Sequence, residues 1–264
     1  MTGKSKLTFT VLGCGNSMGT PTIGNHWGAC DPKEKRNYRT RASAVLRSAE
    51  TTLLIDSGPD LREQANREGL TKVDAVFYTH AHADHVHGIE ELRVFRLRHN
   101  KTIPIYGDQS TMDELQERFA YLFIERNKIY PKVCEPNVLH AAQLNNEFKI
   151  GDITIIPFEQ DHGTCTTLGV RVGDLAYSTD MVDLGQPALE TLIGVKTWIV
   201  DAAAYKMEQN LVHATLQKVI DYNQIIGAEQ VFITHMPPSM DYQTLVRDLP
   251  KGYAPAYDGI TFEL

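Results

Sequence analysis

Short apolar runs rich in β-branched residues alternate along the chain with amphipathic stretches. The apolar runs predict strands because they are short and are bounded by turn-forming residues: Leu7–Leu12, Ser43–Arg47, Thr52–Ile55, Val73–Tyr78, Ile103–Tyr106, Ile153–Phe158, Leu168–Val172, Leu175–Ser178, Thr197–Val200 and Val231–Thr234. The amphipathic stretches predict helices: Asp60–Glu68, Thr111–Phe123, Pro187–Ile193, His213–Ile226 and Tyr242–Leu249. Mixed strands and helices predict an α/β fold.

Three of the predicted strands end on a side chain that can bind a metal. The runs VFYTH, LAYSTD and VFITH end at His80, Asp180 and His235. In layered α/β folds, groups just beyond strand ends tend to meet in one crevice. The stretches VDAVFYTH and AEQVFITH also resemble each other, which suggests two similar sheets that share one site. No Pro- or Ser-rich linker separates them, so we expect one domain over residues 1–264.

Composition narrows the class of protein. The chain has 264 residues, of which 42% are hydrophobic and 22% charged, as in ordinary globular proteins. Its net charge of −7 argues against long nucleic acids as partners, but not against a small phosphorylated substrate such as a nucleotide. No apolar run has the length of a membrane helix, and the N-terminal stretch, with its two lysines, lacks the apolar core of a secretory signal. We therefore expect a cytoplasmic protein.

The segment HAHADH, residues 80–85, concentrates metal-binding side chains. His80 and His82 alternate, so both rings can face one ion, while Asp84 and His85 are adjacent and can face a second. Imidazole and carboxylate groups suit Zn²⁺, Mn²⁺ or Fe²⁺. The alternative is a solvated His-rich loop. Two ions need more ligands, and the candidates are those that follow other strands: His162, Asp180 and His235.

The pattern HxHxDH, followed by a spaced His, Asp and His, resembles the metallo-β-lactamase superfamily. The stretches LGCGNSMGTP and LLIDSGPDL also resemble that superfamily. The resemblance implies an αββα four-layer sandwich, as in ribonuclease Z, with two divalent ions, Zn²⁺ or Mn²⁺, at the edges of the sheets. It also implies the ligand sets: His80, His82 and His162 for one ion, Asp84, His85 and His235 for the other, and Asp180 as the bridge.

His213 favours one chemistry within the superfamily. It resembles the catalytic histidine of the transfer-RNA-processing nucleases and the PhnP-like cyclic phosphodiesterases, whereas lactonases and thiolesterases do not rely on it. A helix-start residue that packs locally is the alternative. Chain length, the spacing from His213 to His235 and the C-terminal LPKGYAPAYDGITFEL favour the PhnP-like group.

The PhnP-like resemblance implies hydrolysis of a small cyclic phosphodiester, a cyclic nucleotide or cyclic sugar phosphate. Attack by a metal-bound hydroxide would be assisted by His213 as general acid, and His213 and Asp84 are the expected catalytic residues. The open alternatives are a lactonase or thiolesterase and a non-catalytic nucleotide-binding module. The resemblance also implies a possible homodimer.

Further expectations concern the surroundings of the metals. Asp56 is expected to orient a ligand imidazole, and Ser17 in the Gly13–Gly19 turn, Arg41 and His213 to contact substrate. PhnP-like proteins hold a structural zinc through a cysteine cluster and a late histidine, but this chain has only Cys30 there and Pro238 in place of the histidine. We expect no structural zinc and leave open whether this region shapes a different pocket. The cysteines contain no CxxC pair and are expected to be reduced: Cys14, Cys30, Cys134 and Cys165.

Overall fold

Two seven-stranded sheets face each other in the computed structural model, which describes residues 7–264. Residues 1–6, which include the two N-terminal lysines, lie outside the described residues. The first sheet has the order β14 (Thr261–Glu263), β1 (Thr8–Gly13), β2 (Ser43–Arg47), β3 (Thr52–Ile55), β4 (Ala75–Phe77), β5 (Ile103–Gly107), β6 (Cys134–Val138). The second has the order β13 (Tyr253–Pro255), β12 (Gln230–Thr234), β11 (Thr197–Asp201), β10 (Leu175–Ser178), β9 (Thr166–Val172), β8 (Ile153–Asp161), β7 (Phe148–Ile150).

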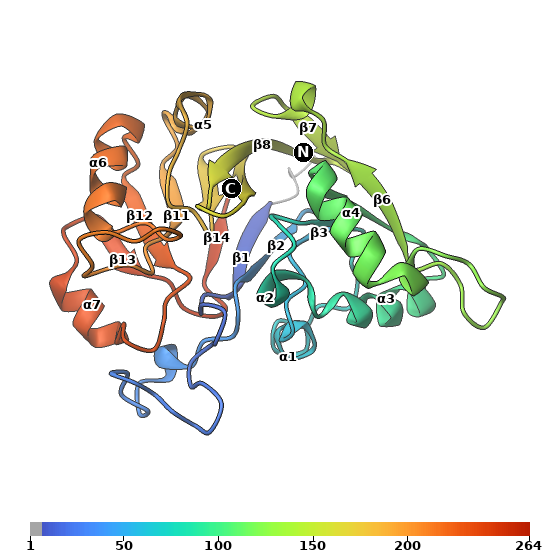
Figure 1. Cartoon of the computed structure of the whole chain (residues 1–264), viewed down its shortest axis with the longest axis horizontal. Helices are drawn as coiled ribbons and strands as arrows, with labels where there is room; N and C mark the ends of the chain where they lie inside the picture. The colour runs from blue at the N-terminus through green and yellow to red at the C-terminus, as the bar shows by residue number, and fades with distance from the viewer. Residues whose placement is uncertain (1–6) are drawn as a thin grey trace, which may run out of the picture.

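Helices cover the outer faces of both sheets (Figure 1). On the side of the first sheet lie α1 (Leu61–Arg67), α2 (Ala83–Val86), α3 (Leu92–His99) and α4 (Gln109–Arg118). On the side of the second lie α5 (Gln186–Leu192), α6 (Leu216–Ile226) and α7 (Tyr242–Asp248). Single 3-10 turns occur at η1 (Lys35–Asn37), η2 (Ile89–Glu91), η3 (Ala120–Leu122) and η4 (Ala141–Gln143). The predicted four-layer αββα sandwich is confirmed.

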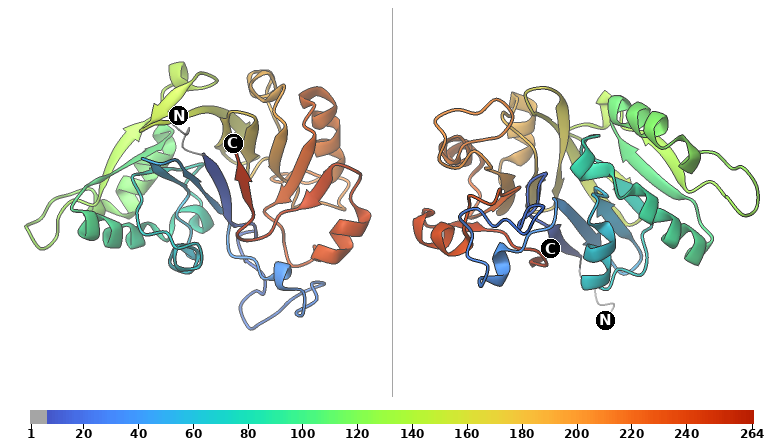
Figure 2. Two further views of the ribbon diagram at one scale, coloured as in Figure 1. Left: turned by 180° about the vertical axis from the view of Figure 1, so that it is seen from behind. Right: turned by 60° about the horizontal axis from the view of Figure 1, so that its bottom comes forward.

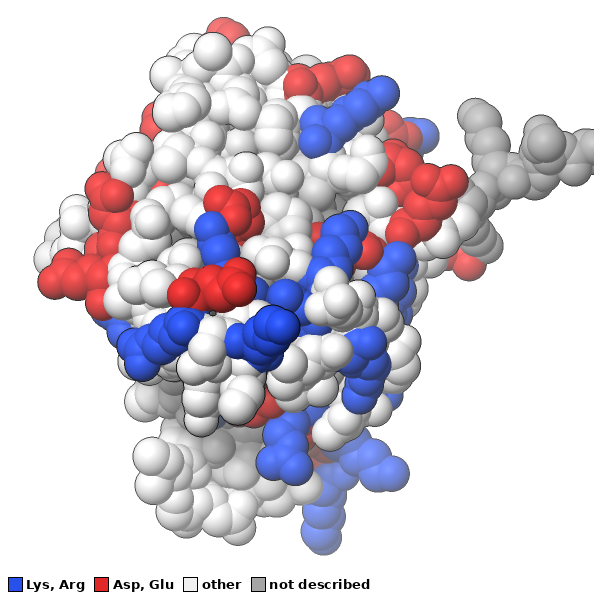
Figure 3. Space-filling model, turned by 90° about the vertical axis from the view of Figure 1, so that its right-hand side faces the viewer, with Lys and Arg blue, Asp and Glu red and all other residues white. Residues whose placement is uncertain are grey.

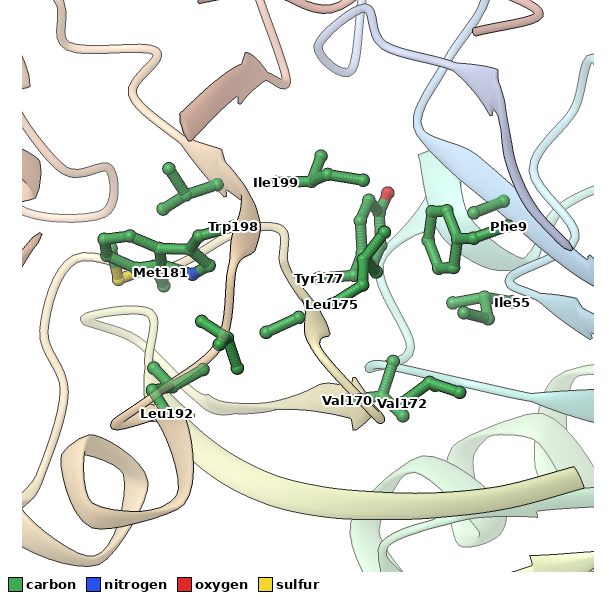
Figure 4. Close-up of a cluster of buried hydrophobic side chains, with 14 of the residues drawn as sticks. Phe9, Ile55, Val170, Val172, Leu175, Tyr177, Met181, Leu192, Trp198 and Ile199 are labelled. Carbon is green, nitrogen blue, oxygen red and sulfur yellow. The ribbon is translucent and has the colours of Figure 1, made fainter. Parts of the chain in front are cut away.

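The space between the sheets is filled by apolar side chains from both (Figure 4). Phe9 of β1 packs against Tyr177 of β10 with ring centroids 5.6 Å apart, and both are fully buried. Trp198 of β11 is also buried, and its indole N–H donates to Ser178 Oγ (2.9 Å). A second cluster joins α1, α3 and α4 to the outer face of the first sheet. Close packing on both faces of the sheets holds the strands, and therefore their ends, in fixed positions in space.

The predicted strands are confirmed with shifts of a few residues at their ends, but some elements were wrong or missed. The predicted helix His213–Ile226 begins only at Leu216, because the Thr215 hydroxyl accepts from Lys218 N and caps it. The predicted helix Thr111–Phe123 ends at Arg118 and continues as η3. The missed strand β6 contains Pro136 and lies at a sheet edge, where proline is tolerated. No helix within residues 7–264 is long and apolar enough to cross a membrane.

The loop of residues 20–38 projects beside α7 (Figures 1 and 2) and is tied down by one buried arginine. The Arg39 side chain is buried, and its guanidinium donates to Met240 O (2.6 Å) and Asn37 Oδ1 (3.1 Å). The buried Cys30 thiol lies 3.9 Å from the same guanidinium and donates to Met240 O (3.5 Å). These contacts connect the loop to the segment before α7.

Replacing Arg39 by methionine should destabilise the fold. Arg39→Met removes the buried guanidinium's hydrogen bonds to Met240 O and Asn37 Oδ1, and we expect the free energy of unfolding to fall by about 3 kcal/mol. Arg36→Met is the matched control, since Arg36 is exposed and pairs with Glu34 at the surface; its cost should stay below about 1 kcal/mol. Urea unfolding of both variants measures the difference, and equal costs would contradict the anchoring role of Arg39.

Candidate metal centre

Parallel strands bring the candidate ligands together at one edge of each sheet. In the second sheet, β10, β11 and β12 run parallel, so Asp180, Asp201 and His235 emerge side by side at or just beyond their C-terminal ends. In the first sheet, β3 and β4 run parallel, and Asp56 and the metal-binding loop that starts at His80 follow them in the same way. The two edges face each other, and the site lies between them.

Three histidines form the first ligand group. Ring nitrogens of His80, His82 and His162 all lie within 4.8 Å of one another. His162 follows β8, and its Nδ1 donates to the Val212 carbonyl (2.6 Å), which leaves Nε2 to face the group. His80 and His162 are buried, and His82 is exposed. The arrangement leaves an open side next to His82.

A mixed set of carboxylates and imidazoles forms the second group: Asp84, His85, Asp180 and His235. Asp180 lies at its centre, with Oδ2 2.5 Å from His85 Nε2 and Oδ1 3.1 Å from His235 Nε2. Its oxygens also lie 3.9 Å from His80 Nε2 and 3.9 Å from His162 Nε2 in the first group. A carboxylate between both groups is placed to bridge two ions.

Asp56 and Thr79 hold ligands of both groups in place. The Asp56 carboxylate accepts from His85 Nδ1 (2.7 Å) and from the Thr79 hydroxyl (2.8 Å). The Thr79 hydroxyl also lies 3.0 Å from His80 Nδ1. One buried carboxylate therefore orients an imidazole of the second group directly and one of the first group through a hydroxyl.

The backbone is strained at three of these positions. Asp56, Asp180 and His235 have φ of 60°, 47° and 57°, in the left-handed region that residues other than glycine rarely adopt. Such strain persists where the surrounding packing imposes it, and it gathers at functional sites. Here it turns each chain segment sharply at a strand end, so that the side chain points into the site.

Without bound ions, the carboxylates and imidazoles interact strongly. Burial alone would raise the pKa of Asp180, but the adjacent His235 and His85 hold it well below its usual value. Burial opposes protonation of His235, but the carboxylates of Asp180, Asp84 and Asp201 together outweigh it and raise the pKa of His235 to about 9. Burial and the neighbouring His85 instead lower the pKa of His80 well below its usual value. The second group thus forms carboxylate–imidazolium pairs, whereas His80 of the first group stays neutral.

The donor set fits two divalent transition-metal ions. His80 Nε2 is buried and has no hydrogen-bond partner among the described residues, and His85 Nε2 and Asp180 Oδ2, although 2.5 Å apart, form no well-aligned hydrogen bond. Unpaired polar atoms in a protein interior are costly, and a metal ion would satisfy them. Neutral imidazoles with carboxylates suit Zn²⁺ or Mn²⁺, whose binding would displace the protons now shared with Asp180.

A further pair lies against the second group. His213 Nδ1 lies 2.7 Å from Asp201 Oδ2 and 3.8 Å from Asp180 Oδ1. Asp201 is fully buried and also accepts from Ala203 N (2.7 Å), so its carboxylate is fixed. Asn210 Oδ1 accepts from His213 N (2.9 Å) and shapes the loop that carries the histidine. His213 is partly exposed, and its Nε2 forms no hydrogen bond with any residue from 7 to 264.

The structure brings all seven predicted metal ligands and His213 together, whereas the substrate contacts expected of Ser17 and Arg41 stay predictions. Ser17 is exposed on the turn after β1. Arg41 pairs with Asp60 (Nε–Oδ2 3.1 Å) and borders Gly58, which packs on the Asp84 backbone. Asp201 was missed, although WIVD is another apolar run that ends on a carboxylate.

Substituting Asp56 tests the anchoring of both groups. Asp56→Asn weakens the hydrogen bonds that residue 56 accepts from His85 Nδ1 and the Thr79 hydroxyl. We therefore expect metal affinity to fall about 10- to 100-fold. Competition with a chromophoric chelator measures it. Asp74→Asn is the matched control, because Asp74 accepts from Thr52 N (2.8 Å) at the opposite ends of the same strands. Unchanged affinity in Asp56→Asn would exclude the anchoring role.

Comparison with known proteins identifies the family. A family model described as a beta-lactamase superfamily domain matches residues 51–236. The crystal structure of a diphosphatase from the PhnP family superposes with a TM-score of 0.87 at 31% identity and covers 98% of this chain and 97% of that one.

Curated relatives have different names. An octanoyltransferase of Porphyromonas gingivalis is 32% identical over 259 residues, 95% of this chain and 50% of the relative, so the chain spans half the length of that protein. A ribonuclease Z of Methanopyrus kandleri is 28% identical over 131 residues, 48% of this chain and 42% of the relative. The chain belongs to the metallo-β-lactamase superfamily and, within it, to the PhnP family.

Proposed function

We propose that this member of the metallo-β-lactamase superfamily is a phosphodiesterase that cleaves one P–O bond of a small substrate, with His213 as general acid. The observation that carries the proposal is the pair of His213 and Asp201 beside the metal ligands. A metal centre of this kind suits hydrolysis in general. A positioned proton donor is needed where the leaving group is poor.

The geometry supports a general acid at the free nitrogen of His213. Asp201 accepts from Nδ1–H, so it fixes the orientation of the ring. Nε2 then carries the proton that a leaving alkoxide requires. Proton donation of this kind contributes on the order of a hundredfold or more to the rate.

The remaining side chains would hold the ions and the substrate around them. Two divalent ions, once bound, lower the pKa of water and neutralise charge on the phosphoryl oxygens. The Asp84 carboxylate lies 3.3 Å from His85 Nε2 and 3.5 Å from His235 Nε2. These contacts hold it where it would bind the second ion. The Asp180 carboxylate lies between the two ligand groups and would help to keep the distance between them constant.

A hollow beside the first group favours a hydroxyl-rich substrate. Its volume is about 470 Å³, and Asp161, Thr164 and Cys165 are among its lining residues. Cys165 Sγ lies 4.0 Å from His82 Nε2, so the hollow adjoins the metal ligands. Its lining includes the carboxylates of Glu159 and Asp161 but no Lys or Arg, which suits sugar hydroxyls better than a second phosphate. A cyclic nucleotide or cyclic sugar phosphate has both a phosphodiester for the metal centre and sugar hydroxyls for the hollow.

An acyl hydrolase is the second candidate, and the octanoyltransferase relative favours it. A thiolate leaves at neutral pH without a proton, so thioester hydrolysis would give His213 and Asp201 no role. A non-catalytic nucleotide-binding module would likewise have no use for a fixed acid beside a complete ligand set. The placement of His213 therefore favours the phosphodiesterase.

Removing the proton donor should impair turnover selectively. His213→Ala should lower kcat on a cyclic nucleotide about a hundredfold, with less effect on bis(p-nitrophenyl) phosphate, whose leaving group needs no proton. Asp201→Asn should act in the same direction, because it weakens the hydrogen bond that holds the His213 ring in place. Metal content, measured in parallel, should stay unchanged in both variants. Equal loss on both substrates would argue against a general acid.

A substrate panel separates the candidate functions. The metal-loaded protein should hydrolyse bis(p-nitrophenyl) phosphate and at least one cyclic nucleotide, cyclic sugar phosphate or diphosphate ester. It should leave a chromogenic β-lactam and an octanoyl thioester intact. Chromatography of the products measures all of these. Turnover confined to the thioester would replace the phosphodiesterase with the acyl hydrolase.

A further inference from the structure

A groove on the surface of the first helical layer lies outside the metal centre. It has a volume of about 180 Å³ and lies between α3, η3 and the segment that follows η3. We call it the arginine–tyrosine groove after the side chains that define it: Arg93, Arg96, Leu97, Tyr121, Arg126 and Tyr130. Figure 3 views this side of the molecule, where Lys and Arg side chains form a band interrupted by a few acidic ones.

The groove carries positive charge that the protein itself neutralises only in part. Arg93 pairs with Glu90 (2.9 Å). Arg96 donates only to neutral acceptors, the Lys132 carbonyl (3.0 Å) and Asn100 Oδ1 (2.9 Å). The Arg126 guanidinium has no hydrogen bond or ion pair with any residue of the described chain, and no Asp or Glu among those residues lines the groove. An anion is the complementary ligand.

Aromatic and apolar side chains beside these arginines are unusually exposed. Tyr130 is 58% exposed and Ile129 77%. The loop that presents them is ordered, because Asn127 Oδ1 accepts from Ile129 N (2.9 Å) and Tyr130 N (3.0 Å), and Arg126 N donates to Tyr130 O (3.1 Å). The Tyr130 ring and the Arg126 guanidinium are therefore carried by the same fixed turn. Apolar exposure of this kind marks a binding surface.

The groove adjoins the segment that carries the metal ligands. Arg118, at the end of α4, donates to the Ala81 carbonyl (2.6 Å), and the Phe119 ring packs on His87 at 5.9 Å. Tyr121 follows within η3. A ligand in the groove is thus held on the same framework as the metal loop.

We propose that the arginine–tyrosine groove binds single-stranded nucleic acid, with phosphates at Arg96 and Arg126 and a base stacked on Tyr130. An exposed and a half-buried arginine beside exposed aromatic rings offer the combination of charge and stacking surface that such strands require. An acidic peptide would use the charge but not the tyrosine ring, and a second copy of the chain would bring arginines against arginines. This site goes beyond the proposed function and does not depend on it. The negative net charge of the whole chain does not reveal this local group of arginines.

Fluorescence anisotropy with fluorescein-labelled hexauridylate tests the proposal on the metal-loaded protein. We expect saturable binding that weakens steeply with added salt, and a loss of affinity of at least about fivefold in Arg126→Ala and in Tyr130→Ala. The Arg126 side chain has no hydrogen bond or ion pair with the described residues, so its removal should leave the fold intact, as circular dichroism can verify. Arg62→Ala, at an exposed arginine on α1, is the matched control and should bind like the unmodified protein.

Several outcomes would overturn the proposal. These are absence of binding, an affinity in both groove variants that equals that of the unmodified protein, displacement of the probe by decaglutamate as effectively as by unlabelled hexauridylate, or a dimer that Arg126→Ala dissociates. Gel analysis of the probe establishes that it stays intact. Because hydrolysis of bis(p-nitrophenyl) phosphate reports on the metal centre alone, failure of the groove proposal is distinguishable from failure of the phosphodiesterase proposal.

Discussion

The carboxylate of Asp180 is the group around which the whole site is arranged. It is buried, it lies within 4 Å of ring nitrogens from His80, His85, His162 and His235, and its backbone is held in the left-handed region. A buried carboxylate is tolerated only with compensating positive charge. Protons on the imidazoles supply that charge in the absence of metal, and two divalent ions would supply it better. The need to satisfy this one group explains why so many ligands converge on it.

That convergence depends on the two-sheet architecture. Each sheet contributes parallel strands whose ends lie at one edge, and a core packed between the sheets keeps the edges in register. The first sheet supplies His80 with its support from Asp56 and Thr79, and the second supplies Asp180, Asp201 and His235. The loop before α6 then adds His213 next to Asp180. The strand ends thus position the candidate metal ligands, and Asp201, at one of these ends, fixes His213 beside them.

The sequence predicted the strands well because their apolar runs are short and well bounded. It predicted HAHADH as a metal-binding segment without help, since those ligands are adjacent, whereas the assignment of His162 and Asp180 to particular ions came from resemblance. The predicted helix start at His213 was wrong because Thr215 caps the helix, which begins at Leu216, and the spacing of apolar residues does not show this local hydrogen bond. Asp201 escaped notice because its role depends on a contact with His213 across the fold. The arginine–tyrosine groove was not predicted because the net charge is summed over the whole chain and does not show where arginines gather.

The central claim is that these residues hold two metal ions around Asp180. The most direct test is the number of transition-metal ions per chain, measured by mass spectrometry after exhaustive dialysis, in the unmodified protein and in His82→Ala. We predict about two ions in the unmodified protein and about one in the variant, because Asp84, His85, Asp180 and His235 form a separate group. A single ion in the unmodified protein, or the same number in both, would contradict the account.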